Sequence, residues 1–256
     1  MIKIAEAFQN GKAFIPFLTA GDPSLDKTEE FIVKMAEAGA DLIEIGLPFS
    51  DPIAEGPVIQ EADIRALAAG TTTDKVFEMV ASVRKKVDIP LVFMTYLNPV
   101  FHYGYERFCT RCTEIGVSGL IIPDMPYEEK EELAGICRAH GMELISMIAP
   151  TSEARIRSIA SEAEGFLYVV SSMGVTGVRS EITTDIGAMT AVAKEAGSAP
   201  CAIGFGISTP QQAADMAQHA DGVIVGSAIV KIIAKYGADA APHIYDYVKS
   251  MKDAVR

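Results

Sequence analysis

Two glutamates, Glu44 and Glu55, are the residues whose type and spacing best suit proton-transfer chemistry. Glu44 stands within an apolar run, and Glu55 ends the proline- and glycine-rich loop after it, in DLIEIGLPFSDPIAEGPVIQ (Asp41–Gln60). A buried carboxylate is costly unless it is paired or its pKa is shifted, so such groups gather where a reaction uses them. A Glu that merely bridges a nearby loop is the structural alternative. The elements around the two acids decide between these interpretations.

Short apolar runs alternate with amphipathic patterns along the 256 residues. The apolar runs predict strands at Ala13–Leu18, Asp41–Gly46, Pro90–Thr95, Ser118–Pro123, Met142–Ile148, Gly165–Val170, Cys201–Gly206 and Asp221–Gly226. The patterns between them predict helices at Leu25–Ala38, Thr73–Lys86, Glu128–His140, Thr151–Ala163, Thr184–Ala196 and Pro210–His219. An extra helix is expected at Ile2–Asn10, and glycines stand where helices should end, at Gly39, Gly116, Gly141 and Gly197.

Strand–helix alternation predicts a parallel sheet built from right-handed crossover units. Eight such strands favour a single α/β domain over residues 1–256, a closed (β/α)8 TIM barrel with the extra N-terminal helix at its bottom. A doubly wound open sheet is the alternative. In the barrel, Glu44 lies near the C-terminal end of the second strand and Glu55 in the next loop, so both acids face the same mouth.

Composition narrows the class of protein. The chain has a formal net charge of −12 and no block of Lys and Arg, which argues against nucleic-acid binding. It has neither a signal-peptide pattern nor an apolar run of about 18 residues, so we expect a cytoplasmic protein. Because the overall field repels anions, an anionic substrate would need a local binding device.

The cysteines and histidines give little support for metal or redox chemistry. Cys109 and Cys112 form a CxxC inside a helical pattern, without a second pair to complete a zinc site. The histidines are scattered, with no HExxH spacing. We therefore expect no metal site and no disulfide framework.

Glycine-containing loops after the last three strands predict a phosphate site. They are SSMGVTG with Thr176 and Gly177, GFGIST with Phe205 and Gly206, and GSAIVK with Gly226 and Ser227. Backbone N–H groups of such loops can converge on an anion, and the short helix after Gly226 adds its positive end. Tight turns alone are the alternative for each glycine, but loops seven and eight are the usual phosphate site of this fold.

Apolar strand residues would form the rest of the pocket, although plain barrel packing explains each of them singly. They are Phe17, Met94, Ile121, Ile148 and Tyr168. The residues therefore suggest a phosphorylated substrate with an apolar body beside two carboxylates. Acid–base chemistry on the substrate itself is the natural reaction class.

With these residues in place, the chain resembles the tryptophan synthase alpha subunit family over essentially its whole length. The segments that carry the resemblance are IPFLTAGDP, ADLIEIGLPFSDPIAEGPVIQ, MTYLNPVF, IIPDMPYEE, IAPTS, YVVSSMGVTG, GFGIS and GSAIVK. The PFSDP loop together with GVTG, GFGIS and GSAIVK is specific, whereas a generic phosphate-binding barrel would share only the last two.

The resemblance implies retro-aldol cleavage of indole-3-glycerol phosphate to indole and glyceraldehyde 3-phosphate, a lyase step of tryptophan biosynthesis. Glu44 matches the catalytic acid–base residue, and Glu55 matches the acid that accepts the indole N–H. By the same matching, the indole pocket would comprise Phe17, Met94, Ile121, Ile148, Tyr168 and Phe205. Phosphate would be bound by Gly177, Gly206, Gly226 and Ser227, and Thr176 would couple the sixth loop to the PFSDP loop.

Two positions depart from the familiar pattern. Familiar members carry Asp in a PLADGP context where this chain has Glu55 in PIAEGP, so the side chain is one methylene longer. They also carry an Arg in the sixth loop, where Ser172 stands here. The second departure predicts weaker or differently timed closure of that loop.

The resemblance also implies a partner. The family works as an α2β2 tetramer with a beta subunit that receives indole through a tunnel, and pyridoxal phosphate belongs to that partner, with no cofactor in this chain. The PFSDP loop, Asn98-Pro99 and Asp124–Pro126 would face it. The alternatives are a stand-alone lyase that releases indole, a non-catalytic barrel that only activates a beta subunit, and an unrelated phosphosugar isomerase.

Overall fold

A computed structural model of the chain describes residues 2–170, 185–204 and 206–255. Its strands all run parallel and form a closed ring in the order β1 to β8, in which β8 pairs with β1. The strands are β1 (Ala13–Thr19), β2 (Ile43–Gly46), β3 (Leu91–Met94), β4 (Gly119–Ile121), β5 (Glu143–Ile148), β6 (Leu167–Val170), β7 (Cys201–Gly204) and β8 (Gly222–Val225). The ring confirms the predicted (β/α)8 barrel and excludes the open sheet.

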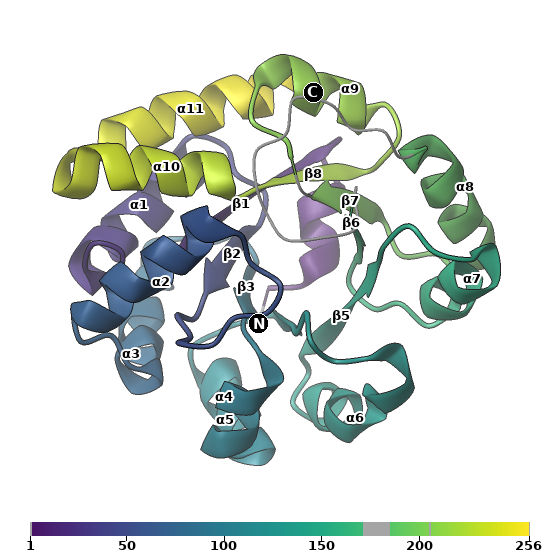
Figure 1. Cartoon of the computed structure of the whole chain (residues 1–256), viewed down its shortest axis with the longest axis horizontal. Helices are drawn as coiled ribbons and strands as arrows, with labels where there is room; N and C mark the ends of the chain where they lie inside the picture. Colours follow the sequence, from purple (N-terminus) through teal and green to yellow (C-terminus); the bar gives the residue numbers. More distant parts are fainter. Residues whose placement is uncertain (1, 171–184, 205, 256) are drawn as a thin grey trace.

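Helices surround this ring (Figure 1). They are α1 (Leu25–Glu37), α2 (Pro57–Ala68), α3 (Thr73–Val83), α4 (Leu97–Tyr103), α5 (Tyr105–Glu114), α6 (Glu131–Ala139), α7 (Glu153–Ser161), α8 (Ile186–Ala196), α9 (Pro210–Ala217), α10 (Ser227–Tyr236) and α11 (Ala241–Ala254). Two short 3-10 helices, η2 (Tyr127–Glu129) and η3 (Gly237–Asp239), precede α6 and α11. No helix in the described ranges is long and apolar enough to cross a membrane.

Side chains capping the helix starts explain where several helices begin. Ser24 accepts the Lys27 N–H before α1, and Thr209 accepts the Gln212 N–H before α9. The Gln212 side chain in turn accepts the Thr209 N–H, so two of the unpaired donors of this helix end are satisfied. Each cap fixes where a strand-to-helix loop ends.

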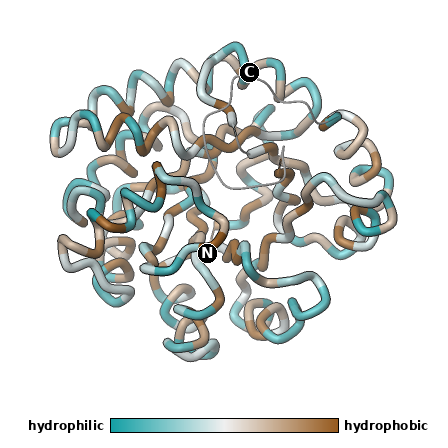
Figure 2. Tube along the Cα trace, viewed as in Figure 1, coloured by the Kyte–Doolittle hydropathy of each residue, from teal (hydrophilic) through white to brown (hydrophobic). Residues whose placement is uncertain are grey.

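Alternation along the strands builds two layers of core. Residues such as Phe14, Leu18 and Ile43 point outward beneath the helices, whereas Ile15 and Val92 fill the barrel interior. Figure 2 shows the hydrophobic residues along the strands and the inward faces of the helices. The interior is therefore packed, and open space is confined to its end.

The N-terminal segment closes the bottom of the barrel as expected, but as a 3-10 helix, η1 (Ile4–Phe8). Ile4 and Ala7 are buried in the interior cluster, and the Ser118 hydroxyl donates to the Ile2 carbonyl at 2.7 Å. Gly119 leaves room for η1, because a Cβ at this position would lie 2.9 Å from the Ile4 side chain. The mouth at the other end is thus the open one.

Candidate active site

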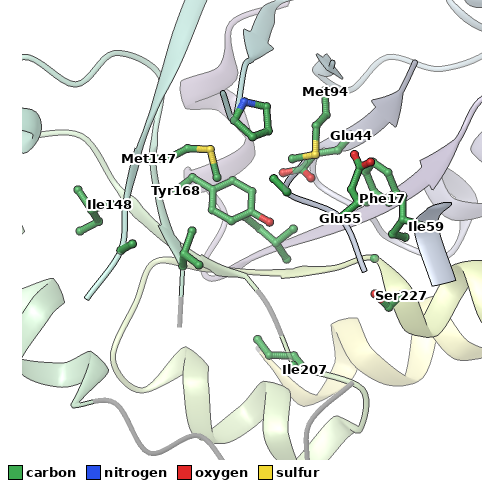
Figure 3. Close-up of a pocket in the computed structure, with 17 residues that line it drawn as sticks. Phe17, Glu44, Glu55, Ile59, Met94, Met147, Ile148, Tyr168, Ile207 and Ser227 are labelled. Atoms are coloured by element: carbon green, nitrogen blue, oxygen red, sulfur yellow. The ribbon is translucent and has the colours of Figure 1, made fainter. Parts of the chain in front are cut away.

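A cavity of about 250 Å³ opens at the C-terminal ends of the strands. It brings together most of the residues expected from the sequence, which are Phe17, Glu44, Glu55, Met94, Ile148, Tyr168, Gly206, Gly226 and Ser227. Figure 3 shows Glu44 and Glu55 close together beside Phe17 and Met94, with Ser227 and Ile207 farther along the cavity. Thr176, Gly177 and Phe205, like Ser172, lie outside the described residues.

Ile121 occupies a different place from the other expected pocket residues. It is fully buried in the barrel interior, where β4 pairs it with Met94 of β3. Pro123, two residues further along, lines the cavity from this part of the chain. Contact between Ile121 and a substrate remains a prediction.

Glu44 is a buried acid without a partner. It lies on β2, its side chain is 0% exposed, and neither carboxyl oxygen has a hydrogen-bond partner. Burial raises its pKa well above the ordinary value, because the charged form is poorly solvated there. Glu44 is therefore built to hold a proton and to release it to a group inside the cavity.

Two glycines make room for aromatic rings near this acid. The strand register pairs Phe17 with Glu44, and a Cβ at Gly46 would come within 2.7 Å of the Phe17 ring. A Cβ at Gly204 would fall 2.6 Å from a ring carbon of Tyr168. Burial raises the pKa of the Tyr168 hydroxyl, and the nearby Glu44 raises it further. Gly204 thus makes room for the Tyr168 ring. Gly204 itself is not among the described residues that line the cavity.

Glu55 reaches the same cavity from the loop before α2. Burial raises its pKa to about 7, while hydrogen bonding with Tyr96 and Asp63 favours its charged form. Its Oε2 atom is buried and has no hydrogen-bond partner. The loop is held in place because the Ala54 N–H donates to the Tyr96 hydroxyl at 2.9 Å. One oxygen of Glu55 is thus held while the other is free to meet a ligand.

Asp63 and Tyr96 are site residues that the sequence analysis missed. Asp63 lies on α2 with a 5% exposed side chain, and burial together with Glu55 raises its pKa to about 8. The buried face of α2 gave a usable signal, because Asp63 stands among Ile59, Ala62 and Ala66 at helical spacing. An acid on the apolar face of a helix indicates a functional or paired group.

The other end of the cavity suits an anion. Gly206 has φ +81°, a left-handed conformation that favours glycine, and it turns the chain after β7. Gly226 and Ser227 line the cavity where α10 begins, and the Gly226 carbonyl accepts the Ile229 and Val230 N–H groups. The N–H groups at the very start of a helix have no carbonyl partner within it. The positive end of α10 therefore faces the mouth.

The cysteines take no part in this cavity. Cys109 and Cys112 on α5 and Cys137 on α6 are buried, and the Cys109 and Cys137 sulfurs lie 4.0 Å apart. Among the described residues, no group of three or more potential ligands could hold a metal ion.

A closed barrel with two buried acids and the positive end of a helix at one mouth fits the class of acid–base enzymes for phosphorylated substrates. The family model described as tryptophan synthase alpha chain matches residues 4–256. The chain therefore belongs to the tryptophan synthase alpha chain family. The family's reaction is the cleavage of indole-3-glycerol phosphate, a lyase step in tryptophan biosynthesis, which confirms the expected enzyme class.

Individual relatives agree with this family over the whole chain. The tryptophan synthase alpha chain of Lacticaseibacillus casei is 50% identical over 255 residues, covering 100% of this chain and 96% of the relative. The crystal structure of the alpha chain from Legionella pneumophila is 37% identical with a TM-score of 0.89, covering 100% and 97%. A chain of the tryptophan synthase complex from Pyrococcus furiosus is 34% identical with a TM-score of 0.87, covering 95% and 99%.

Proposed function

We propose that this chain cleaves indole-3-glycerol phosphate with Glu44 as its acid–base residue and Glu55 as the acceptor of the indole N–H. The observation that carries this assignment is a fully buried, unpartnered Glu44 in the same cavity as Glu55. Structural acids are paired, whereas an unpaired acid in a cavity lacks a stabilising role.

The cavity orients the substrate through its two unlike ends. The apolar side chains of Phe17, Met94 and Tyr168 would enclose the indole ring next to the acids. The phosphate would bind to backbone N–H groups near Gly206, Gly226 and Ser227. Holding both ends places the carbon–carbon bond to be cleaved beside Glu44.

The reaction would proceed by two proton transfers through Glu44. Its carboxyl group first donates a proton to the indole carbon that bears the glycerol chain, and the ring nitrogen becomes positively charged. The resulting carboxylate then removes the proton from the hydroxyl on the adjacent chain carbon. As the carbon–carbon bond breaks, its electron pair returns to the ring, which gives indole and glyceraldehyde 3-phosphate and leaves Glu44 protonated. The raised pKa of Glu44 suits the first step, which needs its acid form.

Glu55 would stabilise the charge that develops on the indole nitrogen. Its unpartnered Oε2 is the available acceptor, and the negative charge of the carboxylate offsets the charge of the ring. The loop is held at the residue before Glu55, because the Tyr96 hydroxyl accepts the Ala54 N–H.

A beta subunit that carries pyridoxal phosphate is the proposed partner, in an α2β2 tetramer that passes indole through a tunnel. The expected partner-facing segments support one continuous face, because the Asp124 carboxylate accepts the Leu97 N–H at 2.9 Å. Ile53 and Phe101, next to these segments, are 73% and 64% exposed. Exposed apolar side chains of this size are typical of protein interfaces. The Pyrococcus furiosus relative belongs to a solved tryptophan synthase complex.

Steady-state cleavage by the wild-type chain and by Glu44→Gln tests the catalytic assignment. We expect the rate constant to fall about 1,000-fold in the variant, since general acid–base residues contribute on this scale. A similar rate in both proteins would remove Glu44 from the mechanism. No cleavage by the wild type, even with a beta subunit, would favour the non-catalytic barrel.

A beta-subunit titration separates the proposed partnership from a stand-alone lyase. We expect the wild-type rate to rise on addition of a purified beta subunit, and Glu44→Gln to stay inactive while still binding that partner. High turnover without a beta subunit and no change on its addition would support the stand-alone enzyme.

A further inference from the structure

A second carboxyl group, that of Asp63 on α2, lies next to Glu55. Asp63 is not among the described residues that line the cavity, yet its carboxyl group hydrogen-bonds with that of Glu55. Both side chains are largely buried, and two carboxylates in contact cannot both be ionised at low cost. One proton therefore has to lie between them near neutral pH.

The surroundings determine which of the two acids is ionised. The Tyr96 hydroxyl hydrogen-bonds with Glu55 and favours its anion. Asp63 is nearly fully buried, at 5% exposure, and burial and the neighbouring Glu55 raise its pKa, so it keeps its proton to a higher pH than Glu55. Since Oε2 of Glu55 has no partner, the contacts with Tyr96 and Asp63 involve its other oxygen.

We propose that Asp63 is a positioning residue that stays protonated and donates a hydrogen bond to the Glu55 carboxylate, leaving Oε2 of Glu55 free for the indole N–H. The proposal rests on the function proposed for Glu55. Asp63 touches no substrate atom and acts only through the orientation and charge of Glu55.

Other charged groups do not compete for this proton. Arg65, on the same helix, forms two hydrogen bonds of 2.8 Å with Asp22, so its charge is committed there. From β1 Asp63 meets the Thr19 side chain, and from the loop after β2 it meets the Phe49 backbone. Toward α10 the contacts of α2 are apolar, in a cluster formed by Phe17, Ile59, Ala62 and Val230.

The pH dependence follows from the order of the two titrations. Both pKa values are raised by burial, so at low pH both acids are protonated, and at high pH both are ionised and repel each other. The arrangement of an anionic Glu55 with a neutral Asp63 is therefore most populated at intermediate pH, and it is lost toward both extremes.

Variants at Asp63 test the proposal through kcat/KM as a function of pH. In Asp63→Asn the amide N–H replaces the acid O–H as the donor, and the amide cannot ionise. We therefore expect near wild-type kcat/KM at pH 7.5. The fall of kcat/KM at high pH should move upward by at least about one pH unit. In Asp63→Ala the donor is lost, and we expect kcat/KM to fall about 10- to 100-fold. Glu61→Gln removes one charge from the exposed face of the same helix and should leave the profile unchanged.

Carbon-13 NMR titration of labelled side-chain carboxyl groups in the ligand-free protein separates this proposal from the function itself. In the wild type we expect the carboxyl groups of Glu55 and Asp63 to titrate as one coupled pair. In Asp63→Asn we expect the pKa of Glu55 to be lower than in the wild type. The role of Asp63 would be overturned if Glu55 and Asp63 were both ionised at pH 6. It would also be overturned if the Asn and Ala variants lost kcat/KM equally and the fall of kcat/KM at high pH did not move. If the coupled pair is present but the wild type cleaves no substrate, the proposed function fails, and with it the catalytic purpose of the pair.

Discussion

At the N-terminal end of the barrel, charged side chains near the core are paired, whereas at the C-terminal end two acids keep oxygens without partners. Asp41 accepts the Phe14 N–H and the Lys252 ammonium at 2.7 Å each. Glu44, by contrast, has no hydrogen-bond partner on either oxygen. Asp41 thus holds the chain together at one end, whereas Glu44 and Glu55 keep oxygens available for a substrate at the other, where Asp22 and Arg65 are paired with each other.

The pairing at the N-terminal end is repeated. Asp221 accepts the Cys201 N–H and the Lys194 ammonium at 2.9 Å each. Arg84 donates to the carbonyls of Val87, Ile89 and Gly116, although its Nε atom is buried without a partner. Because Asp221 and Arg84 hold backbone groups of neighbouring segments through hydrogen bonds, they should matter for stability and not for turnover.

The largest effect should come from replacing the unpartnered acid with an apolar residue. Glu44→Leu should lower the rate constant about 1,000-fold or more, because the proton donor is gone. It should also raise the melting temperature, since a buried polar group without a partner is removed. Turnover assays and thermal melts of the same preparation measure both. A fall in the melting temperature would show that the acid also supports the fold.

The opposite result is expected at the paired end. Lys252→Met leaves the Asp41 carboxylate without its ammonium partner, and the free energy of unfolding should fall by about 2–3 kcal/mol. Urea unfolding measures this loss, and kcat at a temperature where the variant is folded should stay within about twofold. Lys249→Met, which removes an exposed ion pair with Asp253, is the matched control and should cost less than about 1 kcal/mol. A large kcat effect of Lys252→Met would break the division between the two ends.

A smaller effect is expected where the cavity binds the anion. Gly206→Ala places a Cβ on a backbone with φ +81°, so the turn after β7 should shift. We expect the KM for indole-3-glycerol phosphate to rise about tenfold with kcat little changed, because binding energy at the phosphate is lost in ground and transition states alike. Initial-rate kinetics check this split. A loss confined to kcat would place Gly206 in the chemistry of the acids.

The smallest expected effect is on the pH dependence of stability. The folded-state pKa values of Glu44, Glu55 and Asp63 are raised, so the folded state binds protons more tightly than the unfolded chain. Their contribution is therefore most favourable below the ordinary carboxyl pKa and is lost as pH rises toward about 8. Glu55→Gln should lessen the fall in melting temperature between pH 5 and pH 8 by about 3 °C. Parallel melting curves of variant and wild type would contradict the raised pKa of Glu55.

The barrel and Glu44 could be predicted from the sequence because local patterns determine them. Buried parallel strands read as short apolar runs, and an acid in such a run stands out. The observed strands are mostly shorter than predicted, as at β4, because the first and last apolar residues of a run belong to the loops.

Other features depend on contacts between distant segments or have only a weak signal in the sequence. Helix α2 was not predicted, since it directly follows the PFSDP loop and has apolar residues on its exposed face, including Ile64 at 66% exposure. Missing the helix meant missing Asp63. Gly204 is the first residue of GFGIST, the motif that predicts a phosphate loop, but the ring of Tyr168 is what requires a glycine there.

Glycine is also an ambiguous signal at helix ends. Gly39, Gly116 and Gly141 have the positive φ expected after a helix, whereas Gly197 is extended, with φ −141°. A Cβ at Gly197 would overlap the Ala160 carbonyl on the neighbouring helix α7, so close packing explains this glycine. The sequence marks the position but not which of the two reasons applies.

The burial of the acids has a consequence for how quickly a substrate is captured. A phosphate ester approaches a protein with a formal net charge of −12, which slows its arrival. With Glu44 and Asp63 neutral, the three acids Glu44, Glu55 and Asp63 carry one negative charge in place of three. Association should therefore slow as pH rises and recover with added salt, which makes the protonation of these acids a control on substrate entry as well as on bond cleavage.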